Sequence, residues 1–170
     1  MDDGGVSASG PVLRPAGAGP APTPARARRE SPPDDRDEAA ADAARSLYRA
    51  EGVVAVPPDS RIQHLLAPGE GLLAVHHAVV ADSRAADDGV GIPPGVSGAL
   101  YLTTDRLIFT GGVFVAHLLG DVVEAVVAGE DVLLVMRDGV GLRVSVDEPR
   151  LLRVQIAAAR AARRGQVPSR

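Results

Sequence analysis

Four histidines are the residues with the broadest capacity for chemistry, because imidazole binds metals and transfers protons near neutral pH. His76 and His77 are neighbours in a predicted strand, where successive side chains point to opposite faces, so the two cannot share one metal ion. His64 precedes that strand and His117 lies in a later one, and their spacing matches no metal-ligand pattern. We therefore expect packed or surface histidines, with no metal site and no cofactor.

Other catalytic signatures are missing from the sequence. The chain contains 0 Cys, which excludes disulfides, thiolate metal sites and a cysteine nucleophile. It has no Gly-x-Ser-x-Gly elbow and no phosphate-binding Gly-x-x-x-x-Gly-Lys loop. Gly89-Val90-Gly91 is followed by Pro93-Pro94, which precludes the helix that a dinucleotide site requires. The sequence thus predicts a protein that is not an enzyme, and a small hydrolase or metal enzyme is the least favoured alternative.

Composition limits the class of protein and its partners. Of the 170 residues 24% are charged and 45% hydrophobic, which is typical of a globular protein. All 18 basic residues are Arg and Asn is absent, a bias that indicates a GC-rich genome, and we expect a bacterial protein. With 0 Trp, 2 Tyr and 2 Phe there is no aromatic platform for stacked bases, so we expect no nucleic acid partner. The acidic start and the lack of a long apolar run predict a cytoplasmic location.

The chain divides into four parts. Residues 1–34 are rich in Pro, Ala, Gly and Arg and contain almost no large apolar side chains, so we expect a disordered tail. Residues 35–58 are predicted to contain a helix to about Glu51 and a linker that includes Val53–Val56. The domain covers residues 59–165, starting at a short helix from the Asp59-Ser60 cap to Leu66, and residues 166–170 form a second disordered tail.

Within the domain, alternating apolar residues and turn signals predict strands followed by a C-terminal helix. The expected strands are roughly 71–81, 98–104, 106–111, 113–119, 122–128, 131–137 and 140–146, and the helix is about 148–164.

Two hairpins set the expected register. A two-residue Asp138-Gly139 loop pairs Val135 with Leu142 and Leu133 with Val144, so that all four residues face the core under the helix. The other hairpin turns at Thr104-Asp105 and pairs Leu102 with Leu107 and Leu100 with Phe109.

The final helix is amphipathic. Asp147 is its expected cap and Pro149 fits its first turn. Arginines lie opposite a broad apolar face, and both sets follow the helical period: Arg153, Arg160 and Arg164 against Leu151, Leu152, Val154, Ile156, Ala158, Ala159 and Ala162.

Two short segments carry a resemblance to a known family. Leu66-Ala67-Pro68-Gly69-Glu70-Gly71-Leu72-Leu73 resembles the entry segment of bacterial pleckstrin-homology (PH) and GRAM-like domains, and Gly98–Phe109 resembles their central hairpin. The resemblance covers about residues 60–165. It implies a mainly β fold, a PH-like seven-stranded antiparallel barrel or sandwich that is partly open and capped by a C-terminal helix. The family includes lipid binders and peptide binders and has no shared catalytic residues.

The distribution of charge along the chain distinguishes between a lipid ligand and a peptide ligand. Lipid-binding members line the loop corresponding to residues 82–97 with bases, whereas here Arg84 is outnumbered by Asp82, Asp87 and Asp88. Residues 60–147 hold five arginines against eleven acids, a net charge of −6, and residues 148–170 hold six arginines against one acid, a net of +5. The alternative function is therefore a peripheral, anionic-lipid-binding domain that uses Arg153, Arg160 and Arg164, with weak, salt-sensitive contact.

A polypeptide partner is the favoured ligand, and no small-molecule substrate is indicated. The predicted strand Val122–Ala128 lacks proline and has Glu124 as its one charge, so it is an edge that another strand can extend. Val53–Val56 is an internal candidate for covering an exposed edge. We expect Arg106 to bond Asp105 or a neighbouring carboxylate. The candidate partner-binding residues are Val122, Glu124, Val126 and Ala128.

Overall fold

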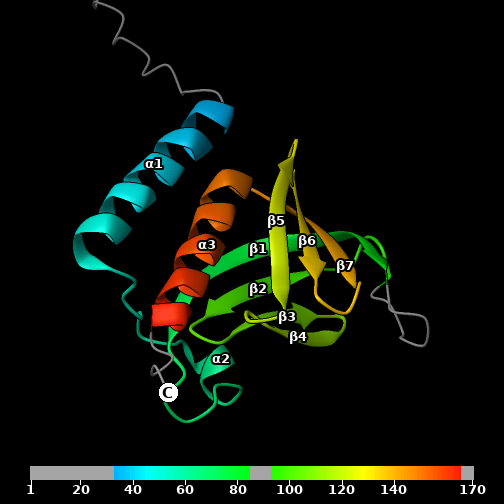
Figure 1. Cartoon of the computed structure of the whole chain (residues 1–170). Helices are drawn as coiled ribbons and strands as arrows, with labels where there is room; N and C mark the ends of the chain where they lie inside the picture. Colours follow the sequence, from blue (N-terminus) through cyan, green and yellow to red (C-terminus); the bar gives the residue numbers. More distant parts are fainter. Residues whose placement is uncertain (1–32, 85–92, 166–170) are drawn as a thin grey trace, which may run out of the picture. The chain divides into compact units, whose positions relative to one another are not determined.

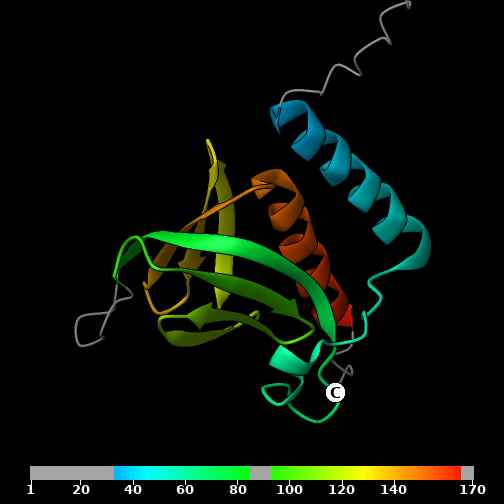
Figure 2. The ribbon, with the colours of Figure 1, turned by 180° about the vertical axis from the view of Figure 1, so that it is seen from behind.

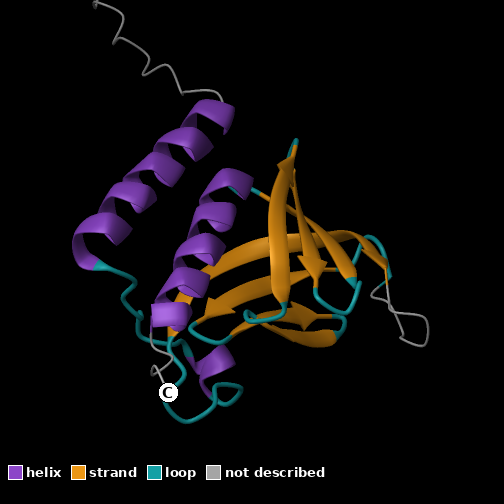
Figure 3. Cartoon of the chain, viewed as in Figure 1, coloured by secondary structure: helices purple, strands orange, loops and turns teal. Residues whose placement is uncertain are grey.

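Two long helices and one sheet account for most of the computed structural model, which describes residues 33–84 and 93–165 (Figure 1, Figure 3). The predicted tails, except for the last residues before Asp35, lie outside the described residues. In chain order the elements are α1 (Pro33–Glu51), α2 (Ser60–Gln63), β1 (Leu72–Arg84), β2 (Ser97–Thr103), β3 (Arg106–Gly111), β4 (Phe114–Leu118), β5 (Val122–Ala128), β6 (Asp131–Met136), β7 (Gly141–Val146) and α3 (Pro149–Gly165).

The seven strands form one antiparallel sheet that is not closed, in the order β4-β3-β2-β1-β7-β6-β5. Strands β4 and β5 are consequently its two edges. Helix α3 follows the last strand and lies beside β5 in both views of the ribbon (Figure 1, Figure 2). The predicted mainly β architecture, with seven antiparallel strands and a C-terminal helix, is confirmed.

The core lies between the inner face of the sheet and α3. From the helix, Leu152, Ile156 and Ala159 are buried against it. The predicted register of the β2–β3 hairpin is confirmed, since Leu100 pairs with Phe109 and Leu102 with Leu107. The strand residues of this core share inward orientation and near-complete burial: Ala78, Val80, Leu100, Leu102, Leu107, Phe109, Val122, Val132, Leu134, Met136, Leu142, Val144 and Val146.

The predicted register of the β6–β7 hairpin is wrong by one residue. Val132 pairs with Val144 and Leu134 with Leu142, so Leu133 and Val135 lie on the outer face, and the Leu133 side chain is 37% exposed. The cause is a three-residue loop, 137–139, in place of the expected two-residue loop. Its last residue, Gly139, has φ +85°, which glycine adopts without the steric cost of a side chain.

Helix α1 was expected to begin near residue 35 and begins at Pro33. It ends at Glu51 because Gly52 takes φ +76° and donates its N–H to the Tyr48 carbonyl. The expected cap of α3 by Asp147 is wrong. The Asp37 carboxylate, from α1, accepts the Arg150 and Leu151 backbone N–H groups at 2.9 Å each.

The predictions for the Val53–Val56 segment and for the 82–97 loop can be compared with the structure. From the Val53–Val56 segment, Val56 donates its backbone N–H to the Leu72 carbonyl at 2.7 Å and forms an isolated antiparallel bridge, so the edge that it meets is the start of β1 and not β5. Strand β1 continues to Arg84, so the predicted 82–97 loop begins three residues too early, and its residues 85–92 lie outside the described part of the chain.

Candidate functional site: the edge of strand β5

Strand β5 is paired on one side only. Its partner is β6, with Val126 opposite Leu133 and Ala128 opposite Asp131. Within residues 33–84 and 93–165, no other strand pairs with it. The edge predicted as a binding surface is therefore an edge in the structure.

A bulge divides the predicted site residues into two sets. Val122 pairs with Met136 and Glu124 with Val135, so Val123 is the extra residue. Because a bulge reverses the alternation of side chains, Val122 is buried in the core and is not available to a partner, which corrects the prediction for this residue. Glu124, Val126 and Ala128 are exposed together on the outer face.

The direction of the backbone groups follows from the hairpin. Ala128 and Asp131 flank the two-residue connection of β5 and β6, and such flanking residues exchange both hydrogen bonds. Alternation along an antiparallel pair then directs the backbone of Val126 toward β6 and that of Ala125 and Val127 away from the sheet. Two consecutive outward positions are thus available to an added strand.

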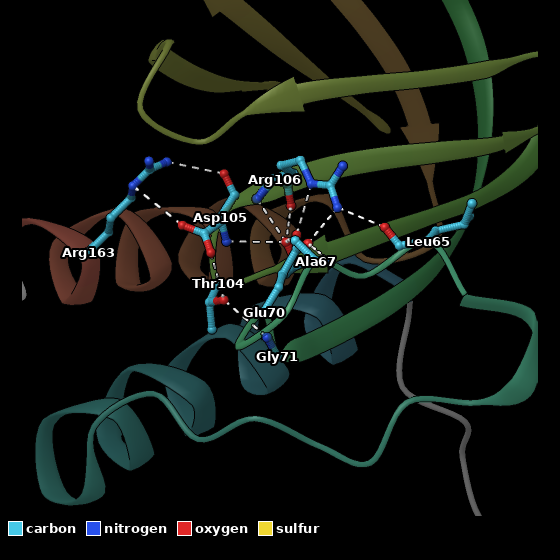
Figure 4. A network of polar contacts seen from close by, with 9 residues as sticks. Leu65, Ala67, Glu70, Gly71, Thr104, Asp105, Arg106 and Arg163 are labelled. Carbon is cyan, nitrogen blue, oxygen red and sulfur yellow. Dashed lines mark hydrogen bonds and ion pairs between the residues drawn. The ribbon is translucent and has the colours of Figure 1, made fainter. Parts of the chain in front are cut away.

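Helix α3 is attached to the sheet near the start of β5 by two arginines. Arg160 donates from its guanidinium to the Val123 carbonyl at 3.2 Å, at the bulge. Burial, with a contribution from the nearby Arg164 charge, lowers the Arg160 pKa from its ordinary value. Arg163 donates to the Asp105 carbonyl at 3.2 Å, and its Nε lies 3.7 Å from the Asp105 carboxylate (Figure 4).

These contacts reduce the basic surface predicted for α3. Of its three predicted arginines, Arg160 is engaged by β5, whereas Arg153 and Arg164 are exposed. Arg153 also borders a hollow of about 410 Å³ between α1 and α3, whose other polar lining residues are Arg45, Tyr48 and Arg49. Burial of the Tyr48 hydroxyl raises its pKa, and a hydrogen bond with Gln155 partly offsets this effect.

A cleft of about 670 Å³ lies at the far end of β5, between the β5–β6 turn, the start of α3 and the first turn of α1. Acidic residues dominate its lining, with Arg36 as the one base: Asp34, Asp37, Glu130, Asp147 and Glu148. A strand added to β5 and continued past Ala128 would meet this acidic cleft.

The segment before β1 is fixed by a buried ion pair, shown in Figure 4. The Glu70 carboxylate accepts hydrogen bonds from the Ala67 backbone N–H, the Thr103 hydroxyl and the Arg106 guanidinium. Arg106 also donates to the Leu65 carbonyl at 2.8 Å. The expectation that Arg106 bonds a neighbouring carboxylate is confirmed, and that carboxylate is Glu70 rather than Asp105.

The same ion pair determines the ionisation of Glu70. Burial alone would raise the Glu70 pKa, but the hydrogen bonds from Arg106, Thr103 and Ala67 outweigh it and hold the pKa below its ordinary value. Residues Thr103 and Arg106, which belong to the β2–β3 hairpin, thus position residues 65–71 on the sheet.

Three of the four histidines belong to strands β1 and β4, neither of which pairs with β5. His76 shares a 2.7 Å hydrogen bond with Gln155 of α3, and burial lowers the His117 pKa against the opposing charges of Asp138 and Asp121. In the described part of the chain, no three His, Cys, Asp or Glu side chains are grouped as metal ligands. None of the described helices is long and apolar enough to cross a membrane.

Sequence reasoning missed the contacts that hold the helices. Asp37, Val123 and Arg163 act through partners distant in the chain, and their local sequence contains no signal of those partners. A capping residue is normally sought beside its own helix, which explains why Asp147 was expected in place of Asp37.

Comparisons with known proteins identify no family. No family model and no curated protein matches this chain. Among solved structures, the C-terminal domain of an unknown protein from Leishmania infantum is similar at 14% identity and a TM-score of 0.39, over 59% of this chain and 88% of that one.

Proposed function

We propose that this chain is a non-enzymatic, PH/GRAM-like interaction domain that binds a polypeptide along the edge of β5 in the cytoplasm. The observation that carries the proposal is the unpaired edge itself, with the backbones of Ala125 and Val127 directed away from β6. A peptide in extended conformation gains affinity from hydrogen bonds with such an edge and specificity from its alternate side chains.

Charge specifies the peptide further. Glu124 is the one charged residue of β5 and is exposed, so a basic side chain beside it on the added strand forms a favourable cross-strand pair. In the cleft beyond Ala128, Asp34 and Asp37 are paired with Arg150, and the remaining acids, Glu130, Asp147 and Glu148, favour the same partner. The proposed ligand is therefore an extended peptide that carries apolar and basic side chains.

Binding of peptides selected from a random display library tests this proposal. Val127→Pro removes an outward N–H without removing a bond to β6, so it should weaken the selected peptides at least tenfold, the loss of one or two hydrogen bonds. The matched control, Ala116→Pro on the opposite edge strand β4, should leave their affinity unchanged. Equal binding by wild type and Val127→Pro would refute the proposal.

The second candidate is weak binding to anionic membranes through α3. It is supported by the exposure of Arg153 and Arg164 and by Arg49, which also borders the hollow between α1 and α3; the other arginine there, Arg45, is paired with Glu38 and Asp42. Co-sedimentation with phosphoinositide vesicles distinguishes the two candidates. Vesicle binding that weakens as the salt concentration rises and is lost in Arg153→Ala, in a protein that binds no selected peptide, would favour the membrane function over the peptide function.

A further inference from the structure

The second edge of the sheet, β4, differs from β5 in what lies beside it. Strand β4 pairs with β3, and within the described residues no strand occupies its other side. Beside β5, by contrast, α3 contributes the Arg160 hydrogen bond to Val123. Edge strands are normally protected by charges, proline or a covering element.

Strand β4 has none of the usual charged or proline residues. Residues 113–119 are Val, Phe, Val, Ala, His, Leu and Leu, and burial lowers the pKa of the one titratable group, His117, so the strand is uncharged at neutral pH. Its outer face is apolar at every position. The Phe114 side chain is 56% exposed and that of Leu118 is 48% exposed, with exposed Ala116 between them.

The backbone of these same three residues is directed outward. Gly111 donates its N–H to the Val113 carbonyl at 3.1 Å, so this pair is a hydrogen-bonded one at the turn of the β3–β4 hairpin. Alternation along the ladder directs the backbones of Val115 and His117 toward β3, and those of Phe114, Ala116 and Leu118 toward the free edge.

From these observations we propose that β4 is a self-association edge, which pairs antiparallel with β4 of a second copy about a two-fold axis at Ala116. In this register Phe114 faces Leu118 of the copy, Leu118 faces Phe114, and Ala116 faces its equivalent. It is the register in which all three outward backbone positions of each copy find a partner. The small Ala116 side chains at the axis leave room for the neighbouring phenylalanines.

The lack of charge on β4 favours a second copy of this chain as the strand that pairs with it. The chain has a net charge of −4, so two copies repel one another over most of their surface, but β4 presents an uncharged strand to an uncharged strand. The other edge lacks this self-complementarity, because Glu124 lies near the middle of β5. A two-fold interface requires one patch to complement itself, as β4 does.

The dimer should be weak. One pair of short strands buries less than the roughly 1,200 Å² of a stable interface, so we expect a dissociation constant on the order of 0.1 mM. Sedimentation equilibrium of the full chain between about 10 μM and 1 mM should therefore show a monomer–dimer equilibrium. A chain that stays monomeric up to about 1 mM would overturn the proposal, and another segment or a foreign strand would then be the occupant of this edge.

A charge swap at the axis tests the register. Ala116→Lys and Ala116→Glu each place like charges opposite one another, and each alone should dimerise at least about fivefold more weakly than wild type. An equimolar mixture of the two variants should restore association to at least the wild-type level. If either variant alone dimerises like wild type, or if the mixture associates no better than its components, the proposal fails.

One control variant and one alternative pair of variants complete the test of the dimer. Val127→Pro, on β5, should leave the dissociation constant of the dimer unchanged within about twofold, which separates this inference from the proposed peptide function. Should a charge at Ala116 lower the thermal midpoint, Phe114→Lys mixed with Leu118→Glu tests the same register at the outer pair.

Discussion

Asp37 is expected to be the main link between α1 and α3, and its replacement should measure how firmly α1 is held. Its carboxylate is buried and accepts two backbone hydrogen bonds from the first turn of α3, at 2.9 Å each, and it lies 3.5 Å from the Arg150 guanidinium. Loss of a capping side chain costs about 0.5–2 kcal/mol, and hydrogen bonds to a charged group contribute about 1.5–3 kcal/mol each. Asp37→Ala should therefore lower the free energy of unfolding by roughly 2–4 kcal/mol.

Urea denaturation followed by circular dichroism measures this free energy. Asp37→Asn keeps one acceptor oxygen and should lose less, about 1–2 kcal/mol, because the charge near the helix N-terminus is removed. The matched control is Asp35→Ala, an exposed acid on the same helix turn, which should stay within about 0.5 kcal/mol of wild type. If Asp37→Ala were as stable as Asp35→Ala, the assignment of Asp37 as the cap of α3 would be refuted.

Three further predictions concern the sheet, the buried ion pair and the N-terminal tail. Leu134→Asp should unfold the domain, since a buried unpaired carboxylate costs several kcal/mol, whereas Leu133→Asp should cost no more than about 1 kcal/mol. The opposite order in urea denaturation would restore the register first predicted. The lowered Glu70 pKa means that its contribution to stability is present above its ordinary pKa of about 4.5 and is lost as the pH falls through the lower folded-state pKa. The stability difference between wild type and Glu70→Gln should shrink as the pH falls below about 4.5, and a constant difference in acid titrations of stability would contradict this. Deletion of residues 1–32 should leave the thermal midpoint unchanged within a few degrees, because those residues offer very few large apolar side chains to a core, and a larger drop would show that they contribute to the fold.

The elements were predictable because local patterns determine them. Alternating apolar residues and turn signals, among them the Asp-Gly and Thr-Asp turns, located the strands to within a few residues. The β2–β3 register followed from the Thr104-Asp105 turn, because the connection between the two strands has the expected length of two residues.

Features that depend on the length of a turn or on distant partners were not predictable. The same Asp-Gly pair, with a positive φ at its glycine, is compatible with a two-residue or a three-residue hairpin loop, and the three-residue loop moved Leu133 to the outer face. The bulge at Val123 likewise has no signal in a run of valines, yet it moved Val122 from the candidate site into the core. The cap provided by Asp37 comes from a residue more than a hundred positions away.

Amide hydrogen exchange at the edge of β5 tests the central claim most directly. Exchange measured by NMR with and without a library-selected peptide should show Ala125 and Val127 protected only when the peptide is bound, because their N–H groups point away from β6. The Val126 amide, which points toward β6, should be protected in both states. Unchanged exchange at Ala125 and Val127 on saturation with the peptide, or equal protection of both before it is added, would contradict peptide binding at this edge.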